Sequence, residues 1–191
     1  EVYATTGPRM VVRFFAGWDF TAADFKGDWV KAGYTRGVPM GGQLTAKAGA
    51  KPSFLISALK DPIGANLDRV QVVKGWVDQA GASHEQVFDV VWSSPETRKI
   101  AGGKLAPVGD TVDTATATYQ NSIGAPALTT VWTDPSFDPG QRAFYYLRVL
   151  EIPTPTWVNF DKVRFNLTLP ADIPLKQQER AYTSPIWFNP S

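Results

Sequence analysis

The sequence contains no cysteine and a single histidine among its 191 residues. Without cysteine there is no disulfide framework, no thiolate nucleophile and no zinc–sulfur site. The lone His84 excludes every metal or catalytic arrangement that needs two imidazoles. We therefore predict no cofactor and no metal site in this chain. A cysteine-free chain is compatible with either redox compartment, so these absences leave the cellular compartment open.

An excess of charge of one sign and long apolar runs are also lacking. The 19 Lys and Arg residues nearly balance the 18 Asp and Glu residues, for a net charge of +1. This balance gives no electrostatic reason to expect nucleic acid or an anionic membrane as a partner. No apolar run approaches the roughly 20 residues that a membrane helix needs. Hydrophobic residues at 43% and charged residues at 19% exclude a disordered tail or a coiled coil.

Aromatic residues, glycine and proline are abundant, which suggests short strands joined by many turns. Apolar residues alternate with period two in several segments separated by Gly, Pro and Asp. We expect strands at 8–16, 53–59, 67–77, 86–92, 127–132, 143–152 and 182–188, and a polar edge strand at 111–119. We expect little helix, with one turn at 21–25 and a short stretch at 175–179, and an irregular excursion at 18–49.

This pattern predicts an all-β fold: one immunoglobulin-like or related β-sandwich domain over residues 1–191, with long loops and little helix. The corner Asp138-Pro139-Gly140 leads into a strand that contains Tyr145 and Tyr146. In such sandwiches a tyrosine hydroxyl of the penultimate strand bonds back to the preceding corner. The segment therefore supports the sandwich interpretation.

Polar residues that resemble parts of active sites have simpler interpretations here. The spacing of these polar residues in the sequence does not match that of a calcium loop or a nucleophile elbow. We interpret these residues as loop carboxylates, a helix cap, turn residues and an exposed loop histidine: Asp19, Asp24, Asp28, Asp134, Asp138 and His84.

Seven tryptophans are present, and most lie within the expected strands, where they are expected to pack in the core. Trp18, Trp29 and Trp157 lie instead in loop-like or proline-flanked stretches. A row of exposed aromatic rings would allow stacking against a ligand such as a sugar. These three residues are the ligand-stacking candidates.

Long motifs are spread over the whole chain. They are EVYATTGPRM at 1–10, NLDRVQVVKGW at 66–76, AFYY at 143–146, EIPTP with Trp157 at 151–157, and ERAYTSPIWF at 179–188. Together they resemble a bacterial domain-of-unknown-function family allied to the PHP-like (polymerase-and-histidinol-phosphatase-like) metallohydrolases. One departure is Thr156, which stands where the family pattern has Arg.

The resemblance implies a longer parent protein, with the metal ligands in an N-terminal PHP-like domain. The chain, which begins at Glu1 rather than Met, would then be the C-terminal fragment. No position here matches the family's metal ligands. The implied partner is that N-terminal domain, and a periplasmic or secreted location is favoured for the parent.

The expected function is that of a non-catalytic accessory or scaffold domain. The alternatives are a carbohydrate- or ligand-binding module and an independent hydrolase. Thr5, Thr6 and Arg9 are the candidates for facing the missing domain or its active site. Gly7 and Pro8 shape a turn at this position, and a guanidinium can hold an anionic group with two hydrogen bonds.

Overall fold

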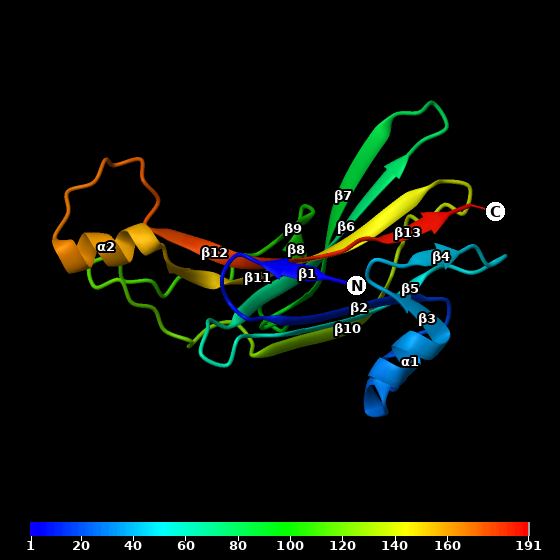
Figure 1. The fold of residues 1–191 in the computed structure, drawn as a ribbon, viewed down its shortest axis with the longest axis horizontal. Helices are drawn as coiled ribbons and strands as arrows, with labels where there is room; N and C mark the ends of the chain where they lie inside the picture. The colour runs from blue at the N-terminus through cyan, green and yellow to red at the C-terminus, as the bar shows by residue number, and fades with distance from the viewer. Residues whose placement is uncertain (191) are drawn as a thin grey trace.

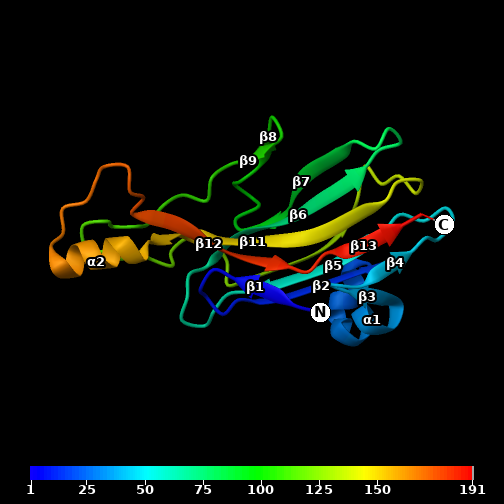
Figure 2. The same ribbon diagram turned by 45° about the horizontal axis from the view of Figure 1, so that its top comes forward.

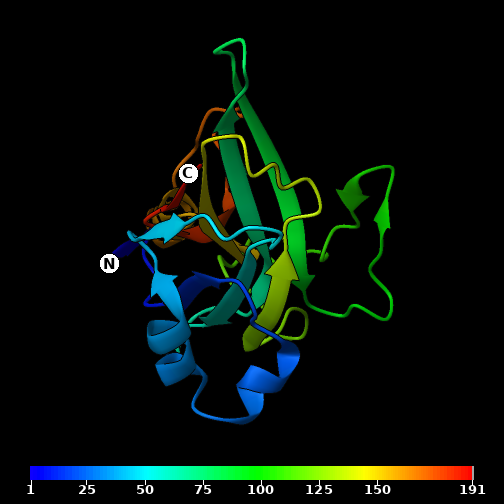
Figure 3. The same cartoon turned by 90° about the vertical axis from the view of Figure 1, so that its right-hand side faces the viewer.

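The structure of the protein is a computed structural model that describes residues 1–190. Strands make up 44% of the residues and helices 12%, which confirms the predicted all-β class. Two sheets lie face to face in an open sandwich (Figures 1 and 2). A small hairpin, β8 (Ile100–Ala101) and β9 (Lys104–Leu105), projects from one side (Figure 3). The immunoglobulin-like topology stays a prediction.

The larger sheet has seven strands and is organised around the long strand β11 (Ala143–Pro155). One edge of β11 pairs with β6, and the other edge pairs with β13 and then with β12. β7 pairs with β6, β1 with β12 and β4 with β13. The bounds of these neighbours are β1 (Tyr3–Thr5), β4 (Gln43–Thr45), β6 (Leu67–Val77), β7 (Ser83–Trp92), β12 (Lys176–Thr183) and β13 (Ile186–Asn189).

The smaller sheet has four antiparallel strands in the order β10-β5-β2-β3. Their bounds are β2 (Val11–Gly17), β3 (Gly37–Pro39), β5 (Ser53–Leu59) and β10 (Ala127–Thr133). The expected strands at 53–59 and 127–132 therefore match the structure closely. The core lies between the two sheets, because alternate side chains of each strand point inward. Its largest members include Phe14, Phe54, Ile56, Tyr145, Leu147 and Phe188.

The smaller sheet is also covered on its outer face. Phe15 and Leu55 point away from the main core and pack with Phe20 in a second buried cluster. The 3-10 helix η1 (Ala22–Lys26) and the helix α1 (Trp29–Arg36) supply partly buried aromatic residues to this cluster. The helical turn expected at 21–25 is confirmed by η1, whereas α1 corrects the prediction of an irregular excursion at 18–49.

The other helix, α2 (Trp157–Phe165), was not predicted either. The side chain of Asp28 caps α1, and that of Thr156 caps α2, in each case by accepting a hydrogen bond from a backbone N–H of the first turn. The prediction of a helix at 175–179 is wrong, because this stretch leads into strand β12 and pairs with the end of β11. No helix within residues 1–190 has the length and apolarity needed to cross a membrane.

Three strand predictions need correction. Residues 111–119 form turns with one isolated bridge between Asp113 and Thr118, rather than an edge strand. β11 does not stop at Ile152 but continues to Pro155. Beyond Glu151 it no longer pairs with β6, and an edge position tolerates proline. The strand expected at 182–188 is divided by Pro185, which lacks the N–H that a ladder requires.

A tyrosine of β11 bonds back to the preceding loop, but at Asp134 and not at the predicted corner Asp138-Pro139-Gly140. The hydroxyl of Tyr145 donates a hydrogen bond to Asp134 Oδ2 over 2.8 Å. Asp134 lies at the start of the loop that leads into β11, and both side chains are buried. Tyr145 therefore fixes the start of this loop to the strand that follows it. Burial, with the neighbouring Asp134 carboxylate, raises the pKa of this phenol.

Candidate functional site

The outer face of the larger sheet carries a continuous set of aromatic rings. In β11, Tyr145 and Leu147 point into the core, so Phe144 and Tyr146 lie on the opposite face. The Phe144 ring is 5.3 Å from the ring of Trp187 on β13 and 6.4 Å from that of Tyr146. Tyr146 is in turn 6.5 Å from Tyr182 on β12. The Trp187 side chain is 49% exposed, so this face is open to solvent.

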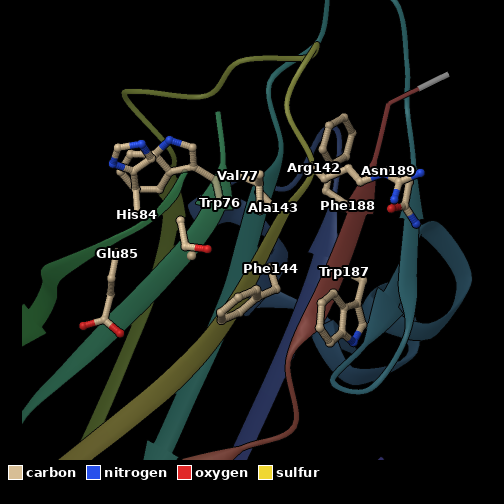
Figure 4. A pocket seen from close by; sticks show the side chains of 12 residues that line it. Trp76, Val77, His84, Glu85, Arg142, Ala143, Phe144, Trp187, Phe188 and Asn189 are labelled. Carbon is tan, nitrogen blue, oxygen red and sulfur yellow. The ribbon is translucent and has the colours of Figure 1, made fainter. Parts of the chain in front are cut away.

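At the end of the sheet two of these rings, those of Phe144 and Trp187, form part of a groove with a volume of about 540 Å³, shown in Figure 4. We call it the aromatic groove. Phe144 and Trp187 lie next to each other in it, and polar side chains stand around them. These polar groups are a carboxylate, a guanidinium and an amide, from Glu85, Arg142 and Asn189, while the imidazole of His84 lines the groove from the opposite face of the sheet.

Gly75 of β6 makes space for the Phe144 ring. The two residues face each other in the β6–β11 register. A Cβ atom at position 75 would overlap the Phe144 ring atoms. The absence of a side chain at Gly75 therefore allows this ring to lie across the neighbouring strand, where it forms a flat surface within the groove.

His84 lies in strand β7 and not in the exposed loop that was expected. Its ring stacks on the Trp76 ring at 5.1 Å with an interplanar angle of 18°. Its Nε2 is 2.7 Å from Asp78 Oδ2 in the β6–β7 turn. This hydrogen bond, together with others from the backbone, lowers the pKa of Asp78. The histidine is thus held by a ring on one side and a carboxylate on the other. The register places it with Trp76 on the core-facing side of the sheet, opposite the face that carries Phe144.

The groove offers stacking surfaces and hydrogen-bonding groups. A flat ligand can lie on Phe144 and Trp187 while its polar groups contact the surrounding side chains. Within the described part of the chain, residues 1–190, no group of three His, Asp or Glu side chains is arranged to hold a metal ion.

Comparison with known proteins places the chain in a family. A family model described as a protein of unknown function (DUF3604) matches residues 1–190. The chain belongs to the DUF3604 family. No curated protein and no solved structure matches it. The match covers the same span as the motifs from which a domain-of-unknown-function family was predicted.

The predicted interface residues of this DUF3604 chain lie near the start of the larger sheet's β1–β12 edge. Thr5 pairs with Ala181 in that edge. The Thr6 hydroxyl donates a hydrogen bond to the Glu179 carboxylate and accepts one from the Arg180 N–H over 2.9 Å. The two threonines therefore support strand pairing.

Arg9 is anchored differently. Its backbone N–H donates to Asp61 Oδ2 over 2.8 Å, while its guanidinium Nε lies 3.4 Å from the same oxygen. The Arg9 side chain is 77% exposed. Hydrogen bonds from the N–H groups of Arg9 and Ile63 lower the pKa of Asp61. The main chain at Arg9 is thus fixed, and its charged group faces solvent.

The three predicted stacking tryptophans do not form one surface. Trp18 packs against the rings of Phe137 and Phe188 at the edge of the core. Trp29 begins α1, where it packs on the second buried cluster. Trp157 begins α2 and is 72% exposed. The two helices lie at opposite ends of the molecule in Figure 1.

Sequence reasoning missed the aromatic groove because it assigned strand tryptophans to the core. The available signal was the stretch 143–149, in which aromatic residues occupy both faces of one strand. When one face of such a strand packs in a sandwich core, the aromatic residues on the other face remain at the surface. Phe144 and Tyr146 are the functional candidates that this signal could have identified.

Proposed function

We propose that this DUF3604 chain is a non-catalytic accessory domain that binds a carbohydrate ring in the aromatic groove. The observation that carries the proposal is the pair of Phe144 and Trp187, which present adjoining rings to an open groove. A pyranose ring has an apolar face of C–H groups and a rim of hydroxyls. The two aromatic rings would stack against the apolar face of the sugar. The hydroxyls would form hydrogen bonds with Glu85, Arg142 and Asn189.

The DUF3604 chain would act next to an N-terminal PHP-like metal domain of the same parent protein, which carries any hydrolytic chemistry. Support for this part of the proposal comes from Arg9. Its guanidinium is exposed although its backbone is fixed against Asp61. An exposed, positioned guanidinium is suited to an anionic group on a neighbouring domain.

The sugar-binding proposal is tested with a glycan array followed by titration of tryptophan fluorescence. A glycan that binds the wild-type chain is then titrated against Trp187→Ala and Trp157→Ala. We expect Trp187→Ala to weaken binding roughly tenfold or more, because it removes a stacking ring. Trp157→Ala, at the other end of the molecule, is the matched control and should bind as the wild type does.

Two results would contradict the proposal. One is that no glycan on the array binds at millimolar concentration. The other is that Trp187→Ala keeps its affinity while Trp157→Ala loses it, which would place sugar binding on α2. A thermal melt of each variant checks the fold. Trp157 is 72% exposed and Trp187 is 49% exposed, so neither substitution removes a core side chain and both melting temperatures should stay close to that of the wild type.

A further inference from the structure

A second, smaller cavity lies near the far end of β11. Its volume is about 170 Å³. Two carboxylates, those of Glu151 and Glu179, line it, and most of its remaining walls are apolar. These walls include Pro8, Ala65, Pro155 and Phe160. We call it the Glu151 cavity.

Glu151 is an unpartnered carboxylate in this cavity. The residue is 1% exposed, and within residues 1–190 no hydrogen bond reaches its Oε1 atom. A buried carboxylate without a partner is unfavourable, so native proteins normally pair such groups. The unused acceptor in a cavity therefore points to a donor that comes from outside the described residues.

Lys60, the cation whose charge acts on Glu151, is already occupied. Lys60 Nζ donates to the carbonyl oxygens of Asp61 at 2.9 Å, Pro62 at 3.3 Å and Gly64 at 2.9 Å. An ammonium group has three protons, and these three contacts use all of them. Lys60 thus affects Glu151 through its charge but makes no hydrogen bond to it.

The groups that face Glu151 carry more negative than positive charge. Glu179 stands on β12, Asp61 and Lys60 lie in the segment after β5, and Tyr119 lines the wall. Burial above all, together with the carboxylates of Glu179 and Asp61 and against the opposing charge of Lys60, raises the pKa of Glu151 to about 7. A bound cation would offset both the free-energy cost of burying the charged carboxylate and its repulsion from the neighbouring carboxylates.

We infer that the Glu151 cavity binds an alkyl cation, which is an ammonium or guanidinium group on an unbranched alkyl stem. The charged head would donate to the Glu151 carboxylate, and the stem would lie along the apolar walls. At about 30 Å³ for each water-sized group, the cavity accommodates roughly six heavy atoms, as in butylammonium or propylguanidinium. A calcium ion would need six to eight oxygen ligands, which these walls do not offer.

The inference is tested by NMR on protein labelled with ¹³C in the glutamate side-chain carboxyl carbon. Butylammonium and propylguanidinium are titrated at pH 8, with pentanol as a neutral probe of similar size. We expect the cations to shift the Glu151 signal in a saturable way, and pentanol to have no such effect. The Glu151→Gln variant keeps the shape without the charge, and binding to it should be at least tenfold weaker. The exposed Glu96→Gln is the matched control and should bind normally.

A wild-type measurement keeps the test independent of the variants. The affinity for the cations should fall as the pH is lowered from 8 to 6, because Glu151 takes up a proton.

A further arm compares butylammonium with N-acetyl-lysine methylamide. Binding of both would identify the occupant as a protein side chain, and binding of butylammonium alone would identify it as a free amine. The inference is overturned if neither cation gives a saturable shift, if pentanol binds equally well, or if Glu151→Gln binds unchanged.

Discussion

Lys74 Nζ lies 2.6 Å from Asp134 Oδ2 between the two sheets, and the two side chains are only 4% and 0% exposed. Lys74 belongs to β6 of the larger sheet, and Asp134 follows β10 of the smaller sheet. Asp134 also accepts hydrogen bonds from the Tyr145 hydroxyl and from Ser136. Lys74 makes a second contact with the Ser136 carbonyl oxygen at 2.9 Å. The ion pair therefore joins the two sheets, and each of its charged groups is also hydrogen-bonded to neighbouring residues.

Asp134→Ala should destabilise the chain by about 3–5 kcal/mol, because it leaves the Lys74 charge buried without its partner. The double variant Lys74→Met/Asp134→Leu removes both charges and should recover most of this loss. Urea unfolding of the three proteins measures both effects. A cost below about 1 kcal/mol for Asp134→Ala would mean that water or another group replaces the carboxylate.

Arg9→Ala should leave the melting temperature nearly unchanged, because the guanidinium is exposed and exposed ion pairs contribute little to stability. Asp61→Ala should lower the melting temperature by several degrees, since the N–H groups of Arg9 and Ile63 lose their acceptor. Calorimetry of the two variants gives the comparison. A large loss in Arg9→Ala would show that Arg9 is a structural residue and would remove it from the proposed interface.

Gly75→Ala should change the shape of the aromatic groove without adding a charged group. The added Cβ must displace the Phe144 ring, which should cost about 1–3 kcal/mol and weaken glycan binding. Combining it with Phe144→Leu makes space for the methyl group and should restore stability but not glycan binding. Unfolding curves and fluorescence titrations separate the two effects. Normal binding by Gly75→Ala would show that the orientation of the Phe144 ring is unimportant.

Glu151→Gln should become more stable than the wild type as the pH rises. The folded-state pKa of Glu151, about 7, is above its ordinary value of 4.5. Its contribution is therefore fully present below pH 4.5 and is lost as the pH rises through 7. Glutamine resembles the protonated form at every pH. We expect no difference near pH 4.5 and an advantage of about 1–3 kcal/mol for the variant at pH 8.

Urea unfolding at several pH values measures this difference. Glu96→Gln, at an exposed position, serves as the control and should show no such trend. If the stability difference between Glu151→Gln and the wild type does not change with pH, Glu151 does not take up a proton in this range.

The strands could be predicted because alternation of apolar residues directly reflects a sheet with one buried face. The stretch 53–59 is an example, and its bounds match β5. The helix α1 could not be predicted in this way, since it is stabilised by packing on Phe15 and Leu55 from outside the sheet. Residues 175–179 resemble a helix locally but are fixed as a strand by pairing with β11.

The candidate sites depend on contacts between distant parts of the chain. Phe144 and Trp187 are brought together by the β11–β13 pair, which sequence patterns alone do not predict. Asp134 was interpreted as a turn residue, and it does accept the Ser136 N–H, but its pairing with Lys74 spans 60 residues. Glu151 was noticed only as part of a motif, because its burial depends on how segments far apart in the chain, among them those of Pro8 and Ala65, surround the end of β11.

β11 carries both sites, with Phe144 near its first residue and Glu151 near its last. At about 3.3 Å for each residue, these two positions are roughly 23 Å apart along the strand. One small ligand is too short to reach from the aromatic groove to the Glu151 cavity. Two ligands would therefore occupy the protein at the same time without competing, and their binding free energies should be additive.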